Sequence, residues 1–427
     1  MISAVRALGC GLALLMCAAA FAQTPHGGAL RYDYEYPFIG YGEAATHNRV
    51  ARLQQRLDRE EVRLAFAQPR GYLDSLLKAL KIDSSSQTLV YSKTSLQTDL
   101  IRSTTPRAIY FNDDTYVAWI AGTSFLEIVT MDAALGPVFY TLANDSRSAT
   151  RQFARETSRC LTCHDTFGMT GGGVPRLLFL STMVDKNGES LTGKPGTDTT
   201  DRTPLSDRWA GWYVTGQHGD LTHFGNVLAN AGDPPAKLAS LRRPNVDSVA
   251  QFFDAKSYAT DKSDIVALLI FEHQAYVHSL ITRAKYKSRV VPQKSMHSLV
   301  EPLVEAMLFV EAAPITSKIT STSGFDRWFE SQGPRDAQGR SLRELDLRTQ
   351  LFKHPLSYLI YSEDFDGLPD SVRELVYTRL AEILGGRDQS PSYAHLSAGM
   401  RAELLEILTG TKPEFAAFAQ PTRVSQR

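Results

Sequence analysis

Between residues 106 and 142, short runs of β-branched and aromatic residues alternate with turn residues, and this pattern constrains the fold more than any other feature of the chain. The apolar runs are 108–111, 116–120, 125–130 and 138–142, and the turns between them are Asn112-Asp113-Asp114, Ala121-Gly122 and Leu135-Gly136-Pro137. Short apolar runs joined by such turns predict antiparallel strands. We therefore expect a meander of about four strands, which excludes a purely helical fold.

Segments with leucines three or four positions apart flank this meander, and this spacing predicts helices. The expected helices are 47–57 and 72–82 before the meander, and 264–285, 295–311, 341–353, 370–385 and 397–410 after it. The chain should thus have an α+β fold, mostly helical, with the antiparallel meander before the cysteine segment at 160–164. Boundaries near 147 and 290 would divide it into regions 23–146, 147–290 and 291–427. A single α+β unit is the alternative, because no linker marks either boundary.

The N-terminus has the pattern of a secretory signal peptide. Arg6 precedes an apolar run from Ala7 to Ala20, and the small-residue pattern Ala20-Phe21-Ala22 follows it. We expect cleavage after Ala22 and export to the periplasm. The run is too short to span a bilayer, and no later stretch is as apolar as a spanning helix requires, so we expect no transmembrane segment.

The charge balance gives no sign of a nucleic-acid partner. The chain has 46 Lys and Arg against 46 Asp and Glu, and it contains no basic block. Binding to nucleic acid or to an anionic membrane surface would require an excess of positive charge. We expect neither partner.

Two of the four cysteines lie inside the expected signal peptide, and the other two stand in Cys160-Leu161-Thr162-Cys163-His164. Two thiols at this spacing can add to the two vinyl groups of one haem, and the next imidazole then reaches the iron from the same side. Three other interpretations use the same cysteines: a zinc site completed by two histidines, a thioredoxin-like dithiol and a disulfide loop. Haem attachment is favoured, because zinc needs two further ligands and because the glycines at 168 and 171–173 interrupt the helix that a dithiol motif would open.

The segment Cys160–His164, together with the export signal, resembles the haem-attachment site of c-type cytochromes. The resemblance implies one covalent haem c, bound through Cys160 and Cys163 and ligated to iron by His164. More loosely, the segments TPRAIYFNDD, GWYVTGQHG and FKHPLSYLIYS are similar to segments of large exported bacterial proteins with a single haem. Those proteins imply no particular substrate.

A second ligand on the other side of the iron would decide between an electron carrier and a reactive centre. His223, which shares a glycine-flanked loop with His218, is the first candidate. His273 is the second, although its place on the apolar face of the helix expected at 264–285 predicts a buried side chain. Met169 is a weaker candidate because it lies only five positions after His164.

Other residues near the motif could contact a haem. Arg155, Arg159 and Arg176 could pair with the propionates, and Trp209 and Trp212 could line the pocket. For each of them an ordinary structural role is the alternative, because arginines are usually solvated and tryptophans usually belong to the core.

Two functions from different classes follow from these observations. The first is a periplasmic monohaem c-type cytochrome that transfers single electrons to or from a redox partner protein. The second is a haem-dependent oxidoreductase whose open distal position accepts a small molecule. No phosphate-binding loop, dinucleotide fingerprint or Ser-His-Asp order in the sequence indicates another activity.

Overall fold

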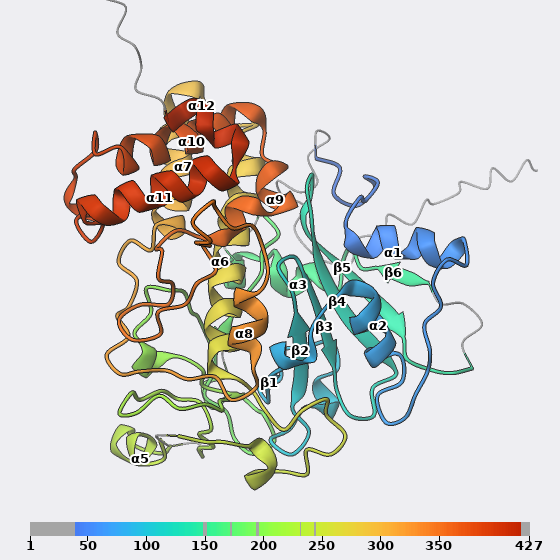
Figure 1. Ribbon diagram of the computed structural model, residues 1–427. Coiled ribbons are helices and arrows are strands. Elements are labelled where there is room, and N and C mark those ends of the chain that lie inside the picture. The colour runs from blue at the N-terminus through green and yellow to red at the C-terminus, as the bar shows by residue number, and fades with distance from the viewer. Residues whose placement is uncertain are drawn as a thin grey trace, which may run out of the picture.

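The computed structural model describes residues 39–147, 152–170, 173–193, 196–230, 232–242 and 245–419. The expected signal peptide lies outside these residues. The centre of the molecule is a seven-stranded antiparallel sheet with the order β6-β5-β4-β3-β2-β1-β9 (Figure 1). Its strands are β1 (Thr88–Val90), β2 (Arg107–Phe111), β3 (Thr115–Trp119), β4 (Phe125–Asp132), β5 (Gly136–Ala143), β6 (Phe153–Arg155) and β9 (Trp212–Tyr213). The predicted meander is confirmed as β2 to β5.

The two faces of the sheet pack against different helices. Because Ile128 lies opposite Tyr140 and Val117 in the strand register, these side chains share one face. That face packs against α1 (Arg49–Asp58) and α2 (Leu73–Leu80), which lie in front of the strands in Figure 1. The other face carries Phe111 and Tyr116, whose rings contact Phe271 of helix α6 at 5.2 and 5.0 Å between centroids.

Helix α6 (Ile265–Lys287) is the central helix of the molecule, and nearly all of its side chains are buried. Asp264 caps its start by accepting a hydrogen bond from the backbone N–H of Val266. Among the described residues, α6 is the helix that is long and apolar enough to cross a membrane, yet 89% of its apolar window is buried inside the protein. An all-round apolar helix of this kind is typical of a protein core.

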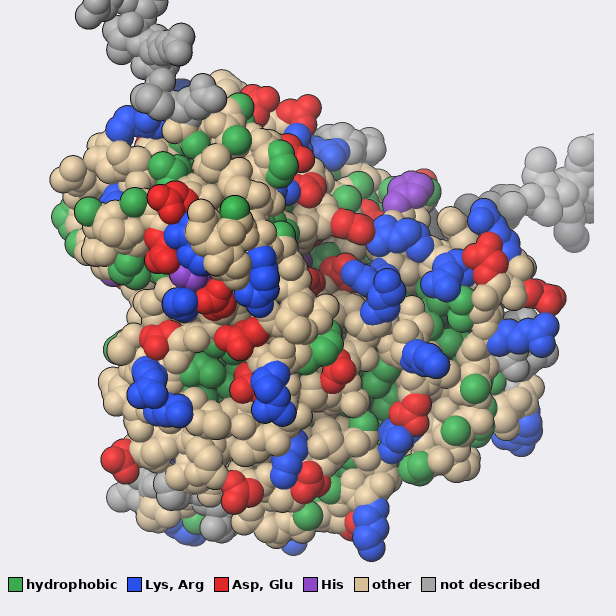
Figure 2. Space-filling view, viewed as in Figure 1, with side chains coloured by type: hydrophobic (Ala, Val, Ile, Leu, Met, Phe, Trp, Pro, Cys, Tyr) green, Lys and Arg blue, Asp and Glu red, His purple; other side chains and the backbone are tan. Residues whose placement is uncertain are grey.

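The remaining helices and strands complete the second half of the chain. The C-terminal layer contains α7 (Met296–Met307), α8 (Phe325–Glu330), α9 (Glu363–Asp366), α10 (Asp370–Leu384), α11 (Ala398–Thr411) and α12 (Pro413–Ala419). Along the chain, α3 (Leu161–His164), α4 (Phe167–Thr170), β7 (Leu180–Ser181), β8 (Thr197–Asp198) and α5 (Pro235–Ser240) come between β6 and α6. The chain is therefore α+β, as predicted. Figure 2 shows acidic and basic side chains interspersed on the visible face.

The helix predicted at 341–353 is wrong. This segment is an irregular loop in which the Asp346 carboxylate accepts hydrogen bonds from the backbone N–H groups of Thr349 and Gln350. Such side-chain caps compete with helical hydrogen bonds. In addition, Leu347 has a left-handed φ of 56°, which an α-helix cannot contain.

Packing is continuous across both of the proposed domain boundaries. Strand β9, after residue 147, pairs with β1, before it. One apolar cluster joins Phe111 of the sheet, Phe271 of α6 and Val304 of α7, and so spans residue 290.

Candidate haem-attachment site

The cysteine motif forms one helical turn, α3, that follows the edge strand β6. The backbone carbonyl of Cys160 accepts hydrogen bonds from the N–H groups of Cys163, at 3.2 Å, and His164, at 3.0 Å. Both thiols are free; Cys160 is half-buried against an apolar cluster that contains Leu161, and Cys163 is exposed. One turn therefore holds the two sulfurs and the imidazole together.

The ring of His164 is oriented by a backbone group twelve residues further along the chain. Its Nδ1 lies 2.8 Å from the carbonyl oxygen of Arg176, and the N–H of Arg176 donates to the carbonyl of His164 at 3.0 Å. Because a carbonyl can only accept, Nδ1 must carry the proton, and Nε2 is left with a lone pair. A histidine that binds a metal through Nε2 requires this tautomer and this kind of second partner.

The local environment keeps the His164 ring neutral and fixed. Its centroid lies 4.6 Å from that of Phe139 on β5. Burial lowers the pKa of His164 and outweighs the hydrogen bond to the Arg176 carbonyl, which raises it; the guanidinium groups of Arg107 and Arg176 lower the pKa further, against the charge of Glu127. A neutral imidazole is the form that binds iron.

The thiols lack the features of a redox dithiol. Burial raises the pKa of Cys160 to about 12, with a further contribution from Glu156 and Glu127, and burial also raises the pKa of Cys163. A nucleophilic dithiol needs the opposite shift. A zinc site gains no support either, because the described residues contain no group of three or more His, Cys, Asp or Glu side chains placed to hold a metal.

The sheet beside His164 leaves apolar surface for a flat ligand. On the face that carries Phe139, the side chains of Ala118 and Val129 are only half-buried, whereas Val117 and Ile128 on the other face are fully buried. Half-covered apolar side chains on the sheet face that meets His164 through Phe139 suit a porphyrin, which needs apolar contact on its faces. The residues present are therefore compatible with a haem at this place.

The arginines expected to pair with propionates have other partners. Arg155 donates to the backbone carbonyl of Ala44, Arg159 pairs with Glu156, and Arg176 pairs with Asp198. Trp212 stacks on Phe179 in the core, with centroids 4.4 Å apart, and its Nε1 donates to Leu180. Arg107 on β2 instead lies close enough to His164 to lower its pKa. No local sequence pattern links Arg107 to the motif, because more than 50 residues separate them.

The predicted burial of His273 is confirmed, but its ring nitrogens are both engaged. Nδ1 lies 2.8 Å from Asp201 Oδ2 and Nε2 lies 2.8 Å from Ser357 Oγ. This arrangement leaves no ring nitrogen of His273 for iron. Met169 lies on α4, which directly follows the motif.

The rings of His223 and His164 have different neighbours, Trp209 for His223 and Phe139 for His164. The segment after the motif contacts α6 at Leu177, which directly follows Arg176 and whose N–H donates to Ser279 Oγ. The loop that carries His218 and His223 begins after Thr215, whose carbonyl accepts from the N–H of Ile265 at the start of α6. Fourteen residues of helix separate these two contacts, which corresponds to about 21 Å. The loop then returns to the middle of α6, because the N–H of Phe224 donates to the carbonyl of Arg208, which pairs with Glu272. There the ring of His223 contacts Trp209 and His218 rather than His164.

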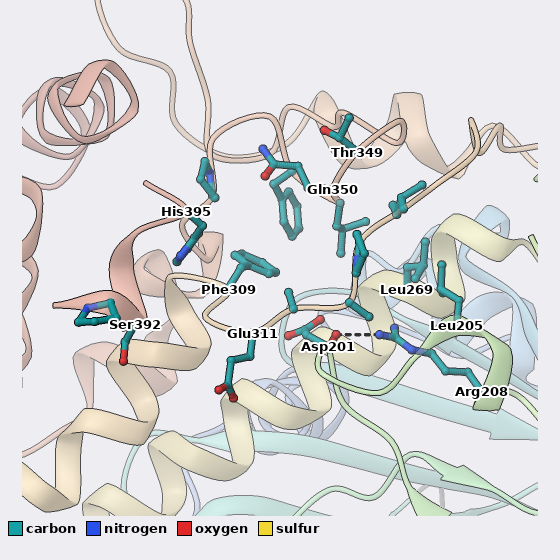
Figure 3. Close-up of a pocket in the computed structure, with 18 residues that line it drawn as sticks. Asp201, Leu205, Arg208, Leu269, Phe309, Glu311, Thr349, Gln350, Ser392 and His395 are labelled. Carbon is teal, nitrogen blue, oxygen red and sulfur yellow. Dashed lines mark hydrogen bonds between the residues drawn. The ribbon is translucent and has the colours of Figure 1, made fainter. Parts of the chain in front are cut away.

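The contacts of His273 have the geometry of a Ser-His-Asp triad, which the sequence order did not reveal. They lie next to a cavity of about 560 Å³, at whose edge Arg208 donates to the backbone carbonyl of Asp201 (Figure 3). Ser357 is fully buried and does not line this cavity. A nucleophilic serine must meet its substrate, so we interpret this network as a structural link between three segments.

Comparison of the chain with models of protein families, with curated proteins and with solved structures finds no match.

Proposed function

We propose that the chain is a monohaem c-type cytochrome of the periplasm, with haem c bound through Cys160 and Cys163, and with His164 as the iron ligand. When bound, the haem would supply a one-electron redox centre. The observation that carries the proposal is the hydrogen bond from His164 Nδ1 to the Arg176 carbonyl, beside two free thiols in the same turn. Neither a disulfide loop nor a dithiol enzyme requires that contact.

Each residue of the site has a definite task in this proposal. Cys160 and Cys163 fix the cofactor to one helical turn, so that it cannot dissociate. Arg176 orients the imidazole through its carbonyl and thereby keeps the Nε2 lone pair of His164 available. Phe139 packs against the ring and restrains its rotation. The exposed side of Cys163 would bring one haem edge close to a redox partner protein.

One observation favours the alternative, a haem-dependent oxidoreductase. Among the described histidines, His273 and His278 use both ring nitrogens in hydrogen bonds, and His218 and His223 contact each other away from the motif. A second ligand from any of these four histidines would therefore require rearrangement. An iron without one is open to a small molecule.

Haem attachment is tested by expressing the chain with a working haem-attachment system and denaturing it. We expect colour and the mass of one haem to remain with the polypeptide after solvent extraction. Cys160→Ser with Cys163→Ser should abolish both, whereas Thr162→Ala, an exposed position in the same turn, should change neither. A colourless wild-type chain of apoprotein mass would end the proposal.

Carbon monoxide distinguishes the two functions. A reduced protein that leaves carbon monoxide unbound and has a low-spin absorption spectrum supports electron transfer. A high-spin spectrum that shifts with carbon monoxide supports the oxidoreductase.

A further inference from the structure

A second pair of potential ligands, His218 and His223, lies outside the proposed haem site in the loop after β9. Their Nε2 atoms are 3.2 Å apart, their ring centroids are 4.8 Å apart and their planes meet at 60°. Only 2% and 1% of their surfaces are exposed. Two imidazoles so close together and away from water must share either a proton or an ion.

The distance between the ring centres bears on these two cases. A straight N–H···N hydrogen bond of this length would place the ring centres roughly 5.5 Å apart, because both rings lie along the line of the bond. Two imidazoles bound at about 2.05 Å to one tetrahedral ion would have nitrogens about 3.3 Å and centres about 5.2 Å apart. The observed 3.2 and 4.8 Å are closer to the second arrangement than to a straight hydrogen bond.

The other ring nitrogens support the same arrangement. Among the described residues, neither His218 Nδ1 nor His223 Nδ1 has a hydrogen-bond partner. Protons on both Nδ1 atoms would leave two Nε2 lone pairs facing each other, which repel unless a cation lies between them.

The surroundings contain further signs of a missing partner. Trp209 packs edge-on against His223, with centroids 5.3 Å apart, and its buried Nε1 has no hydrogen-bond partner in the described part of the chain. Trp209 also has a left-handed φ of 68°, and such strain is typical of functional sites. Exposed residues, among them Gly219 and Thr222, alternate with the two histidines, so an ion would have a short path from solvent.

We propose that His218 and His223 bind one late first-row transition-metal ion, copper in preference to zinc, through their Nε2 atoms. Imidazole ligands suit both metals, and copper(II) binds nitrogen sites most tightly in the series. The described residues place no third His, Cys, Asp or Glu in this group, so the other coordination positions would be open to water or to an added ligand. The copper site does not involve the haem, so either proposal can be wrong without affecting the other.

The test uses the full purified chain, treated with a chelator and then given one equivalent of copper(II). We expect about one copper per chain, with splitting from two nitrogens in the electron paramagnetic resonance spectrum. His218→Ala and His223→Ala should each weaken binding at least about tenfold, because either change removes half of the protein ligands. His297→Ala, at an exposed histidine, should bind copper like the wild type.

The wild-type spectrum keeps the test decisive even where an alanine variant misfolds. Copper that shows no coupling to two nitrogens, or that binds equally well to a correctly folded His218→Gln variant, would overturn the proposal. Zinc that competes copper away at equal concentration would overturn the assignment to copper.

Discussion

Replacing Asp364 by Asn should destabilise the protein strongly, because this carboxylate balances a buried positive charge. Asp364 Oδ1 lies 2.9 Å from Lys285 Nζ, and Oδ2 lies 2.9 Å from His278 Nδ1. The side chains of Lys285 and Asp364 are 1% and 0% exposed. The contacts hold α9 against the C-terminal half of α6, the helix to which the cysteine segment is attached through Ser279.

The size of the effect follows from this burial. An amide can replace one hydrogen bond, but it leaves the Lys285 ammonium group without a counter-charge. Removing one partner of a buried ion pair costs about 3–5 kcal/mol of the free energy of unfolding. The neighbouring Glu363 provides a matched control, because it pairs with Arg52 while 62% of its side chain is exposed. Glu363→Gln should cost at most about 1 kcal/mol.

Urea denaturation of the three proteins, followed by circular dichroism, measures these differences. The double variant Asp364→Asn with Lys285→Met should recover part of the loss, because it also removes the unpaired charge. A loss below about 1 kcal/mol for Asp364→Asn would refute the reasoning, as would a double variant less stable than both single variants.

The lowered pKa of Asp364 also makes the stability of the protein depend on pH in acid. Burial alone would raise the pKa of Asp364, but Lys285 and His278 outweigh this effect, so its pKa lies below the ordinary value. A carboxyl group with a lowered folded pKa stabilises the protein above its unfolded pKa, near about 4, and this contribution disappears as the pH falls through the folded value. As the pH falls, the free energy of unfolding should decrease less steeply in Asp364→Asn than in the wild type.

Three further predictions concern other parts of the fold. His273→Ala should lower the free energy of unfolding by about 2–4 kcal/mol, because it leaves Asp201 and Ser357 unpaired. The haem spectrum should not change, and a changed spectrum would contradict the structural role of His273. Gly136→Ala should destabilise the protein by about 1–3 kcal/mol more than Gly122→Ala, as measured by thermal denaturation. Both glycines have a positive φ, but a Cβ at position 136 would lie 2.4 Å from Thr282, whereas a Cβ at position 122 would meet nothing within 4 Å. The folded pKa of His223, about 3, is below its unfolded value, so the unfolded state binds more protons in acid. Between pH 6.5 and 4.5 the free energy of unfolding of the wild type should therefore fall by roughly 2–3 kcal/mol more than that of His223→Gln. Equal slopes in the two proteins would contradict the burial of a neutral ring.

The sequence was sufficient wherever local chemistry decides the structure. The meander could be predicted because each strand is joined to the next by a short turn, and the turn residues are visible in the chain. Strands β1 and β9 are short, and the residues that pair are more than 120 positions apart in the sequence, so no local pattern predicts their contact. The segment 341–353 has helical spacing, but the caps made by Asp346 and the left-handed Leu347 override it.

The same distinction applies to the candidate sites. The motif Cys160–His164 could be found because its chemistry lies within five adjacent residues. The group that orients His164 is a backbone carbonyl, which any residue type provides, so the sequence could not identify Arg176 in this role. The apolar neighbours of His273 indicate burial without indicating its partner, and the glycine-flanked loop of His223 indicates neither its burial nor its partner. In the structure His273 contacts Asp201 and Ser357, while His223 contacts His218. If those partners persist in the haem-loaded protein, neither His223 nor His273 supplies the sixth ligand of the iron. Replacing either histidine should then leave the spin state of the haem unchanged, and a low-spin haem that becomes high-spin in one of the two variants would show that the fold rearranges when the haem is attached.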